Sequence, residues 1–223
     1  MDLSKSYDFF QPEKFTDRIH IIGCGSVGST IAELLARYGV TKFTLWDFDV
    51  VEPHNLANQM FRQKDIGQPK TEALLNILTE INPEIKDFAK LESNGWNGQQ
   101  LNGFVFLAVD NIDLRRKIVE RHIDSPFIRA VFDVRTRLTD AQHYAADWRD
   151  YKSKQAFLGT MQFSHEEAAE ATPVSACNVT LGVASTVRVI CAYAVNNFIN
   201  FWNGKGVKKM ILADVHEFTV DAI

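Results

Sequence analysis

The chain has 223 residues, of which 46% are hydrophobic and 23% are charged, and its formal net charge is −4. These values are ordinary for globular domains and exclude a disordered or fibrous chain. A chain of this length can bury roughly 70% of its unfolded surface, and the lack of a basic excess argues against binding along duplex DNA.

Cysteine usage and the most apolar segment predict a cytoplasmic protein that does not enter a membrane. Cys24, Cys177 and Cys191 are too few and too scattered for a disulfide framework, and the polar N-terminus does not resemble a signal peptide. Residues 179–202 are the most apolar stretch, but Arg188 interrupts it and three asparagines crowd its end. We therefore expect a buried core or interface helix there.

The first half of the chain alternates predicted strands with predicted helices. We expect strands at residues 19–22, 42–46, 85–91 and 104–109, and helices at residues 29–38, 69–81 and 114–123. Gly39 ends the first helix, and Asn82-Pro83 ends the second. This alternation predicts βαβ crossovers and an α/β fold with a Rossmann-like, doubly wound, mostly parallel sheet.

The second half has a different character. Predicted strands at 127–134 and 138–145 are followed by a polar stretch, the long helix at 179–202 and two short strands within 210–220, which predicts an irregular part with antiparallel strands. Asp133 and Arg135 either line the acceptor side of a cleft or form a salt bridge. No linker divides the chain, so we expect a single domain over 1–223, with a nucleotide-binding core at about 17–125 and an acceptor and dimerisation part at about 126–223.

A glycine-rich turn follows the first predicted strand. Gly23, Gly25 and Gly28 form G-x-G-x-x-G between a strand and a helix, with Ser26 inside the turn. In that context the first glycine permits the turn, the second lets a phosphate approach the backbone, and the third lets the helix pack on the strand. Asp47 ends the next strand, where a carboxylate accepts the hydroxyls of a ribose. The sequence therefore predicts a nucleotide site.

The stretch after Asp47 indicates which nucleotide. Polar and cationic side chains lie beyond the carboxyl ends of the predicted strands, on the side of the glycine turn, and include Asn55, Gln59, Arg62 and Lys70. Such donors are able to clamp the phosphates of a nucleoside triphosphate, and Asp110, at the end of a further strand, can hold Mg²⁺ against them. The glycine turn alone would also permit a nicotinamide-dependent oxidoreductase, which has no need of Lys70 or Asp110.

These motifs together resemble one known family. GCGSVGS, LWDFDVVEPHNL, FRQKDIGQPKTEA and VDNIDLR stand in the order and spacing of the adenylating domain of the ThiF/HesA/MoeB superfamily, the relatives of ubiquitin-activating enzymes. The resemblance is close from Gly23 to Arg115 and looser beyond. It implies an ATP- and Mg²⁺-dependent adenylyltransferase, in the form of a homodimer, that activates the C-terminal carboxylate of a ubiquitin-like or sulfur-carrier protein as an acyl-adenylate and releases pyrophosphate.

The resemblance also implies roles for single residues. Asp47 would bind the ribose, Asn55 and Lys70 would contact the triphosphate, and Asp110 would coordinate Mg²⁺. The other positions expected near the nucleotide are Asp49, Asn58, Gln59, Asn111 and Arg115.

The chain departs from the family at Asn58, where relatives usually carry arginine. Arg62, one turn away, is expected to compensate as a catalytic cation beside Lys70 and Asp110. If Arg62 does not fill that place, ATP would bind but turn over slowly.

Cysteines vary among the relatives. Some relatives use a thiol to take the activated acyl group, and Cys177, just before the long helix, is the candidate here, with a buried structural role as the alternative. Cys24 and Cys191 are expected to serve packing. Many relatives bind zinc through two C-x-x-C pairs that this sequence lacks, so we expect no structural zinc.

Two further functions keep the same ATP site. The chain could activate a non-protein carboxylate, such as threonylcarbamoyl-adenosine in tRNA, although the lack of a basic patch argues mildly against this. It could also be a nucleotide-binding module with weakened catalysis, for which Asn58 is the argument.

Overall fold

The computed structural model describes residues 1–170 and 182–223, and within them eight strands form one sheet. The order across the sheet is β3-β2-β1-β4-β5-β6-β7-β8. The first five strands along the chain run parallel and are β1 (Ile19–Ile22), β2 (Phe43–Trp46), β3 (Lys90–Glu92), β4 (Gly103–Leu107) and β5 (Ile128–Thr136). The last three are antiparallel to their neighbours and are β6 (Asp140–Asp147), β7 (Met210–Asp214) and β8 (Thr219–Ala222).

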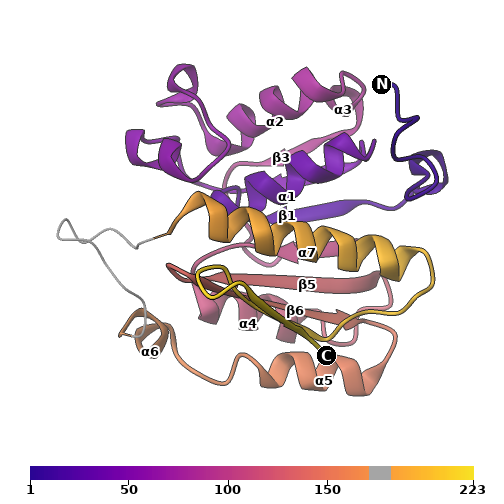
Figure 1. The fold of residues 1–223 in the computed structure, drawn as a ribbon, viewed down its shortest axis with the longest axis vertical. Coiled ribbons are helices and arrows are strands. Elements are labelled where there is room, and N and C mark those ends of the chain that lie inside the picture. Colours follow the sequence, from indigo (N-terminus) through magenta and orange to yellow (C-terminus); the bar gives the residue numbers. More distant parts are fainter. Residues whose placement is uncertain (171–181) are drawn as a thin grey trace.

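Helices cover both faces of this sheet (Figure 1). One face carries α1 (Ser26–Arg37), α2 (Lys70–Ile81) and the long helix α7 (Ala184–Trp202), and α1 packs beside α7. The other face carries α4 (Ile112–Arg121) and α5 (Tyr151–Gly159). Shorter elements are α3 (Ile85–Phe88), α6 (His165–Glu170) and 3₁₀ turns at Pro12–Lys14, Pro53–Ala57 and Gln63–Asp65.

The central parallel strands are buried on both faces, as their unbroken apolar sequence predicts. In β4, Phe104 and Phe106 face α7, while Val105 and Leu107 face α4, because successive side chains of a strand point to opposite sides. The ring of Phe198 on α7 lies 5.0 Å from that of Phe104 and 5.9 Å from that of Phe106. An aromatic layer therefore seats α7 on the sheet, which confirms a core helix in this segment.

The structure corrects one predicted element. Residues 85–91 do not form one strand: Ile85–Phe88 are helical, and only Lys90–Glu92 pair with β2. The Asn82 side chain accepts a hydrogen bond from the Glu84 amide, which turns the chain into the short helix after α2. β3 is left as a three-residue edge strand.

The other predicted elements agree with the structure in kind and differ at their ends, whereas α5 and α6 lie in the polar stretch for which no element was predicted. α1 begins at Ser26, inside the glycine turn and three residues earlier than expected. α7 begins at Ala184. Residues 179–181, the start of the expected helix, lie outside the described residues. Over residues 1–170 and 182–223, every helix is too short or too polar to cross a bilayer.

Candidate active site

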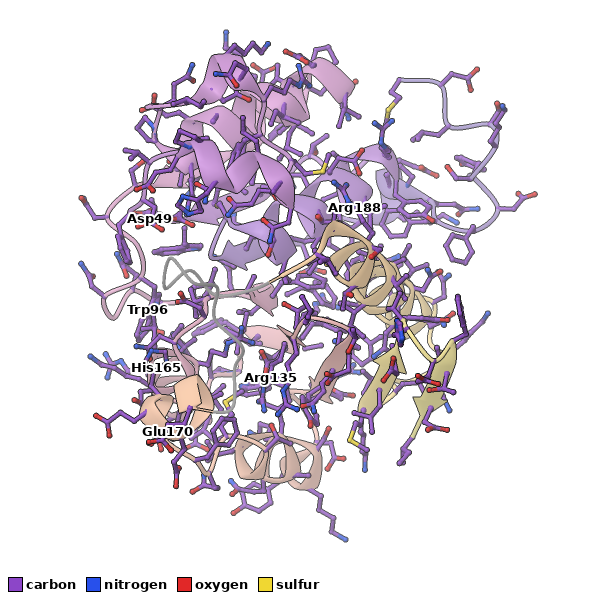
Figure 2. The ribbon with its side chains drawn as sticks, turned by 60° about the vertical axis from the view of Figure 1, so that its left-hand side comes forward. Asp49, Trp96, Arg135, His165, Glu170 and Arg188 are labelled. Atoms are coloured by element: carbon purple, nitrogen blue, oxygen red, sulfur yellow. The ribbon has the colours of Figure 1, made fainter. Side chains whose placement is uncertain are left out.

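A cleft of about 1310 Å³ lies at the carboxyl ends of the parallel strands. It opens where the chain leaves β1 for one side of the sheet and β4 for the other, the place where open α/β sheets bind ligands. We call the part beside β1, β2 and α2 the nucleotide half, and the part beside β5, β6 and α5 the far half. Asp49, Trp96, His165 and Arg135 all line this cleft, and Figure 2 shows the first three along one side of the view and Arg135 nearer its middle.

The glycine turn presents bare backbone to the nucleotide half. Gly23 has a φ of +96°, and a Cβ there would lie 2.8 Å from the backbone of Ala108. A Cβ on Gly28 would lie 1.8 Å from the carbonyl oxygen of Gly23, so α1 packs directly on the turn. A Cβ on Gly25 would meet only the Gln59 amide, at 4.0 Å. Because Gly25 provides no side-chain cap for α1, the first amides of that helix remain available to an anion.

Asp47 is fixed at the tip of β2 by two backbone amides. Its Oδ2 accepts a hydrogen bond from the Cys24 amide at 2.6 Å, and its Oδ1 accepts one from the Asp49 amide at 2.9 Å. Burial raises the pKa of Asp47, and these two hydrogen bonds act in the opposite direction. The carboxylate is thus held in one orientation beside the glycine turn.

Lys70 places an ammonium group in the cleft. Its side chain is 9% exposed, and Nζ donates to Oδ2 of Asp49 at 2.7 Å, while the Asp49 carboxylate is half exposed. The Lys70 amide also donates to the Asp49 carbonyl at 2.9 Å, which fixes the start of α2 against the end of β2. An anion entering the cleft would meet a largely buried ammonium group whose partner, the Asp49 carboxylate, also lines the cleft and is half exposed.

Three amide side chains from the loop before α2 line the same half. Asn55 is buried and its Oδ1 accepts from the Glu52 amide at 2.9 Å, while the Asn58 amide donates to the Gly182 carbonyl at 3.1 Å. Oε1 of Gln59 is buried without a hydrogen-bond partner among the described residues. A buried oxygen without a donor is costly, so a ligand that donates a hydrogen bond would stabilise this position.

Asp110 is an exposed carboxylate that lines the cleft just after β4. Among the described residues, no group of three or more His, Cys, Asp or Glu side chains could hold a metal ion by itself. Mg²⁺ commonly takes only one or two protein carboxylates and completes its shell with phosphate oxygens and water. The donor set therefore fits a metal shared with a nucleotide.

The two residues expected beside Asp110 serve the protein itself. Oδ1 of Asn111 accepts from the Leu114 amide at 2.9 Å and caps α4, and Asn111 does not line the cleft. Arg115 reaches the cleft floor, but it is buried and its guanidinium bonds to protein carbonyls and to Asp133.

Arg62 lies outside the cleft, which corrects the expectation that it would replace the arginine missing at Asn58. Its Nη1 pairs with Glu80 on α2 at 2.6 Å, and the other oxygen of Glu80 accepts from Lys64. The Asp65 carboxylate accepts from the Arg62 amide at 2.8 Å, and this tight turn directs the side chain to the outer face of α2. Cys177 lies outside the described residues.

Two aromatic side chains of the site were missed by the sequence analysis. Phe48 stands between Asp47 and Asp49 in the chain, lines the cleft and is 73% exposed. Trp96 is buried, lines the cleft and donates from Nε1 to the Gln99 carbonyl at 2.9 Å. Phe48 could have been predicted from the sequence, because an aromatic residue between two acids after a strand lies beside the expected nucleotide. Trp96 could not, because it lies in a loop without any periodic pattern.

Asp133 and Arg135 were expected either to line the acceptor side of the cleft or to form a salt bridge, and in the far half Arg135 does both. Arg135 lines the cleft and also pairs with the fully buried Asp133 at 2.7 Å. Arg137, in the turn after β5, and Gln142 and Tyr144 on β6 also line this half.

Comparison with known proteins places this geometry in context. A family model described as the ThiF family matches residues 10–221. Ubiquitin-like modifier-activating enzyme 5 of Arabidopsis thaliana is 40% identical over 86 residues, which are 39% of this chain and 19% of that protein. Molybdopterin-synthase adenylyltransferase of Escherichia coli (strain K12) is 40% identical over 83 residues, which are 36% of this chain and 33% of that protein.

Solved structures share the fold at low sequence identity. The crystal structure of E. coli MccB with ATP superposes with a TM-score of 0.68 at 17% identity and covers 93% of this chain and 63% of that one. The crystal structure of PaaA gives a TM-score of 0.69 at 15% identity, with 93% and 64% coverage. The chain thus matches a third or less of the two curated relatives and less than two thirds of either crystal structure.

Proposed function

The chain belongs to the ThiF family, and from that membership and the cleft we propose that it is an ATP-dependent adenylyltransferase. Its substrate would be the C-terminal carboxylate of a ubiquitin-like or sulfur-carrier protein, since similar proteins are named for ubiquitin-like modifier activation and for adenylation of molybdopterin synthase. The observation that carries the proposal is the meeting of the glycine turn, Asp47, Lys70 and Asp110 on one cleft.

The residues divide the binding of ATP among them. Asp47 would accept the ribose hydroxyls, and the amides at Gly25 and the start of α1 would face the phosphates. Lys70 would exchange Asp49 for a phosphate oxygen while keeping its place in the cleft wall. Asp110 would hold Mg²⁺, which supplies positive charge against the phosphate oxygens when it is bound.

The reaction is an attack of a carboxylate oxygen on the α-phosphorus of ATP. A new P–O bond forms the acyl-adenylate, the bond between the α-phosphorus and the bridging oxygen breaks, and pyrophosphate leaves with the electron pair. Both partners are anions, so fixed positive charge near the phosphates is the main demand on the protein. Lys70 meets that demand, and the protein needs no covalent intermediate for this step.

The carboxylate would arrive through the far half, which is continuous with the nucleotide half in one cleft. A homodimer and a cytoplasmic location belong to the same proposal. A thiol role for Cys177 stays a prediction, because it lies outside the described residues.

One observation favours a slower variant of this function. Asn58 stands where relatives usually carry arginine, and Arg62 is engaged by Glu80 outside the cleft. Among the described residues of the nucleotide half, Lys70 is then the cation left to face the phosphates, since its partner Asp49 is half exposed and can be exchanged for a phosphate. We infer an enzyme that binds ATP well and turns it over slowly.

Pyrophosphate exchange tests the proposal. Labelled pyrophosphate should enter ATP when a candidate carrier is present, and Lys70→Ala should lower that exchange at least about tenfold, because a charge-stabilising contact is lost. Lys64→Ala is the matched control, since Lys64 belongs to the same loop region but pairs with Glu80 outside the cleft. ATP binding without exchange by any carrier would indicate a binding module, and binding of a nicotinamide dinucleotide in place of ATP would indicate an oxidoreductase.

A further inference from the structure

A buried ion cluster lies under the floor of the cleft, where the two halves meet. The carboxylate of Asp133 is fully buried on β5 and pairs with two guanidinium groups, those of Arg115 on α4 and Arg135 on β5. The side chains of Arg115 and Arg135 are 7% and 16% exposed. One carboxylate therefore holds two arginines that reach in different directions.

The arm formed by Arg115 holds the segment that leads to Asp110. Nε of Arg115 donates to the carbonyl of Val109 at 2.7 Å, and Nη1 donates to the carbonyl of Val134 at 2.9 Å. Val109 directly precedes Asp110, so the guanidinium ties the backbone of the expected metal ligand to the end of β5. Arg115 has no need to touch a nucleotide to influence how Asp110 is presented.

The arm formed by Arg135 holds the wall of the far half. Its Nη1 donates to the carbonyl of Thr160 at 2.8 Å, and its Nη2 donates to the Thr160 hydroxyl at 3.0 Å, just after the end of α5. The guanidinium carbon lies 4.6 Å from the ring centre of Tyr144 and 5.7 Å from that of Phe163. With Nε bonded to Asp133 as well, most donors of Arg135 are used within the protein.

The energy of the ion pairs alone does not account for these contacts. Buried ion pairs are often no more stabilising than well-packed apolar residues of similar size. The two guanidinium groups satisfy the carbonyls of Val109, which follows β4, of Val134, which lies just past the pairing of β4 with β5, and of Thr160, which follows α5. Buried carbonyls at such ends need donors, and an apolar replacement would provide none.

We propose that Asp133 is a positioning residue that couples the two halves of the cleft. Through Arg115 it sets the backbone that presents Asp110, and through Arg135 it sets the wall along which the carboxylate substrate enters. The inference rests on the proposed function, since it gives each arm a separate task in that reaction. The two arms are therefore separable by experiment.

Calorimetry and pyrophosphate exchange on the full chain test the first arm. ATP affinity is measured with Mg²⁺ and with EDTA for the wild type and for Arg115→Lys, which keeps the charge but loses the forked donors. We expect the gain in affinity from Mg²⁺ to fall about tenfold, as when the outer support of a metal ligand is lost, while affinity in EDTA stays unchanged. The KM for the carrier should not move.

The second arm should give the opposite pattern. Arg135→Lys is expected to raise the KM for the carrier about tenfold, because the substrate is held less accurately, and to leave the gain from Mg²⁺ unchanged. Asp133→Asn should alter both readouts. Arg149→Lys is the matched control, since Arg149 pairs with Asp147, is 70% exposed and does not line the cleft.

Several results would overturn the inference. If both lysine variants change the two readouts equally, or change neither, the cluster is a structural support without separate tasks. Thermal unfolding checks that each variant is folded. If Arg135→Lys does not fold, Thr160→Val provides a milder perturbation of the second arm. A wild-type chain that binds no ATP would overturn the proposed function and this inference with it. If the wild type catalyses pyrophosphate exchange but the Arg115, Arg135 and Asp133 variants behave like the control Arg149→Lys, only this inference is overturned.

Discussion

The parallel and antiparallel parts of the sheet build their shares of the cleft in different ways. In the parallel part, the glycine turn, Asp47 and Lys70 come from ends of strands and starts of helices that follow one another in the chain. At β5, where the pairing changes from parallel to antiparallel, the walls depend on side-chain contacts with other elements, such as that of Arg135 with Thr160 after α5. The chemistry of the nucleotide half is thus a property of local segments, and the shape of the far half is a property of tertiary packing.

Each part has one buried histidine on its described strands, which makes the comparison testable. Nδ1 of His20 on β1 accepts from the Trp46 indole at 3.1 Å, and its Nε2 lies 3.0 Å from Oδ1 of Asn102. Nδ1 of His143 on β6 lies 3.1 Å from the Asp133 carbonyl, and its Nε2 lies 3.0 Å from the Asn197 amide. Both rings are neutral with both nitrogens engaged, and burial lowers the pKa of each to about 4.

The largest expected effect is a loss of stability in mild acid. In the unfolded chain a histidine takes up its proton near pH 6.5, whereas these two take it up only near pH 4 when folded. The unfolded state is therefore favoured as pH falls through that window, and each histidine should cost roughly 2 kcal/mol of unfolding free energy between pH 7.5 and 5.

Urea unfolding at a series of pH values measures this effect. His20→Gln and His143→Gln should each remove about half of the pH dependence, and His216→Gln, at an exposed position, is the control. A pH dependence carried by one histidine alone would mean that only one part of the sheet is sensitive to acid.

The next effect concerns the antiparallel part only. The Asn197 side chain accepts from the Lys208 amide at 2.8 Å and donates to the Lys208 carbonyl at 2.8 Å, and so joins α7 to the segment before β7. Asn197→Ala should lower the unfolding free energy by about 2 kcal/mol, because it leaves buried polar groups without partners. Urea unfolding measures the loss, and the exposed neighbour Asn196 serves as the control through Asn196→Ala. Equal losses for the two variants would contradict the assignment.

A third test tries to restore a cation to the nucleotide half. Asn58→Arg places a guanidinium at a position that lines the cleft and is expected to raise the rate of pyrophosphate exchange about tenfold, because one more positive charge would face the phosphates. Asn58→Gln is the control, since it perturbs the hydrogen bond to the Gly182 carbonyl without adding charge. An unchanged or lower rate in Asn58→Arg would mean that Asn58 is not the limiting departure from the family.

The same contrast between the two parts explains what the sequence could predict. The glycine turn, Asp47 and Lys70 were identifiable because the carboxyl ends of neighbouring parallel strands must share one edge, whatever the rest of the chain does. The position of Arg62 could not be predicted from its distance of one turn from Asn58. The Asp65 carboxylate accepts from the Arg62 amide and turns the loop, and the guanidinium pairs with Glu80 on α2. The link from Arg135 to Thr160 spans 25 residues and carries no periodic signal.

The smallest expected effect concerns Phe48, the exposed aromatic side chain between Asp47 and Asp49. Phe48→Ala should raise the KM for ATP about fivefold with kcat unchanged, the lower end of the range for stacking of a base on an aromatic ring, because Phe48 is open to solvent on one side. Steady-state exchange at varied ATP concentrations measures both constants.

Inorganic tripolyphosphate separates base recognition from phosphate binding in that experiment. As a competitive inhibitor it carries the phosphates without a base, so its inhibition constant should be the same for the wild type and for Phe48→Ala. Phe127→Ala is the matched control, because Phe127 is 68% exposed and lies outside the cleft. A loss of tripolyphosphate binding in Phe48→Ala would instead assign this side chain to the placement of Asp47 and Asp49, and the base would then have to be recognised by Trp96 and its neighbours.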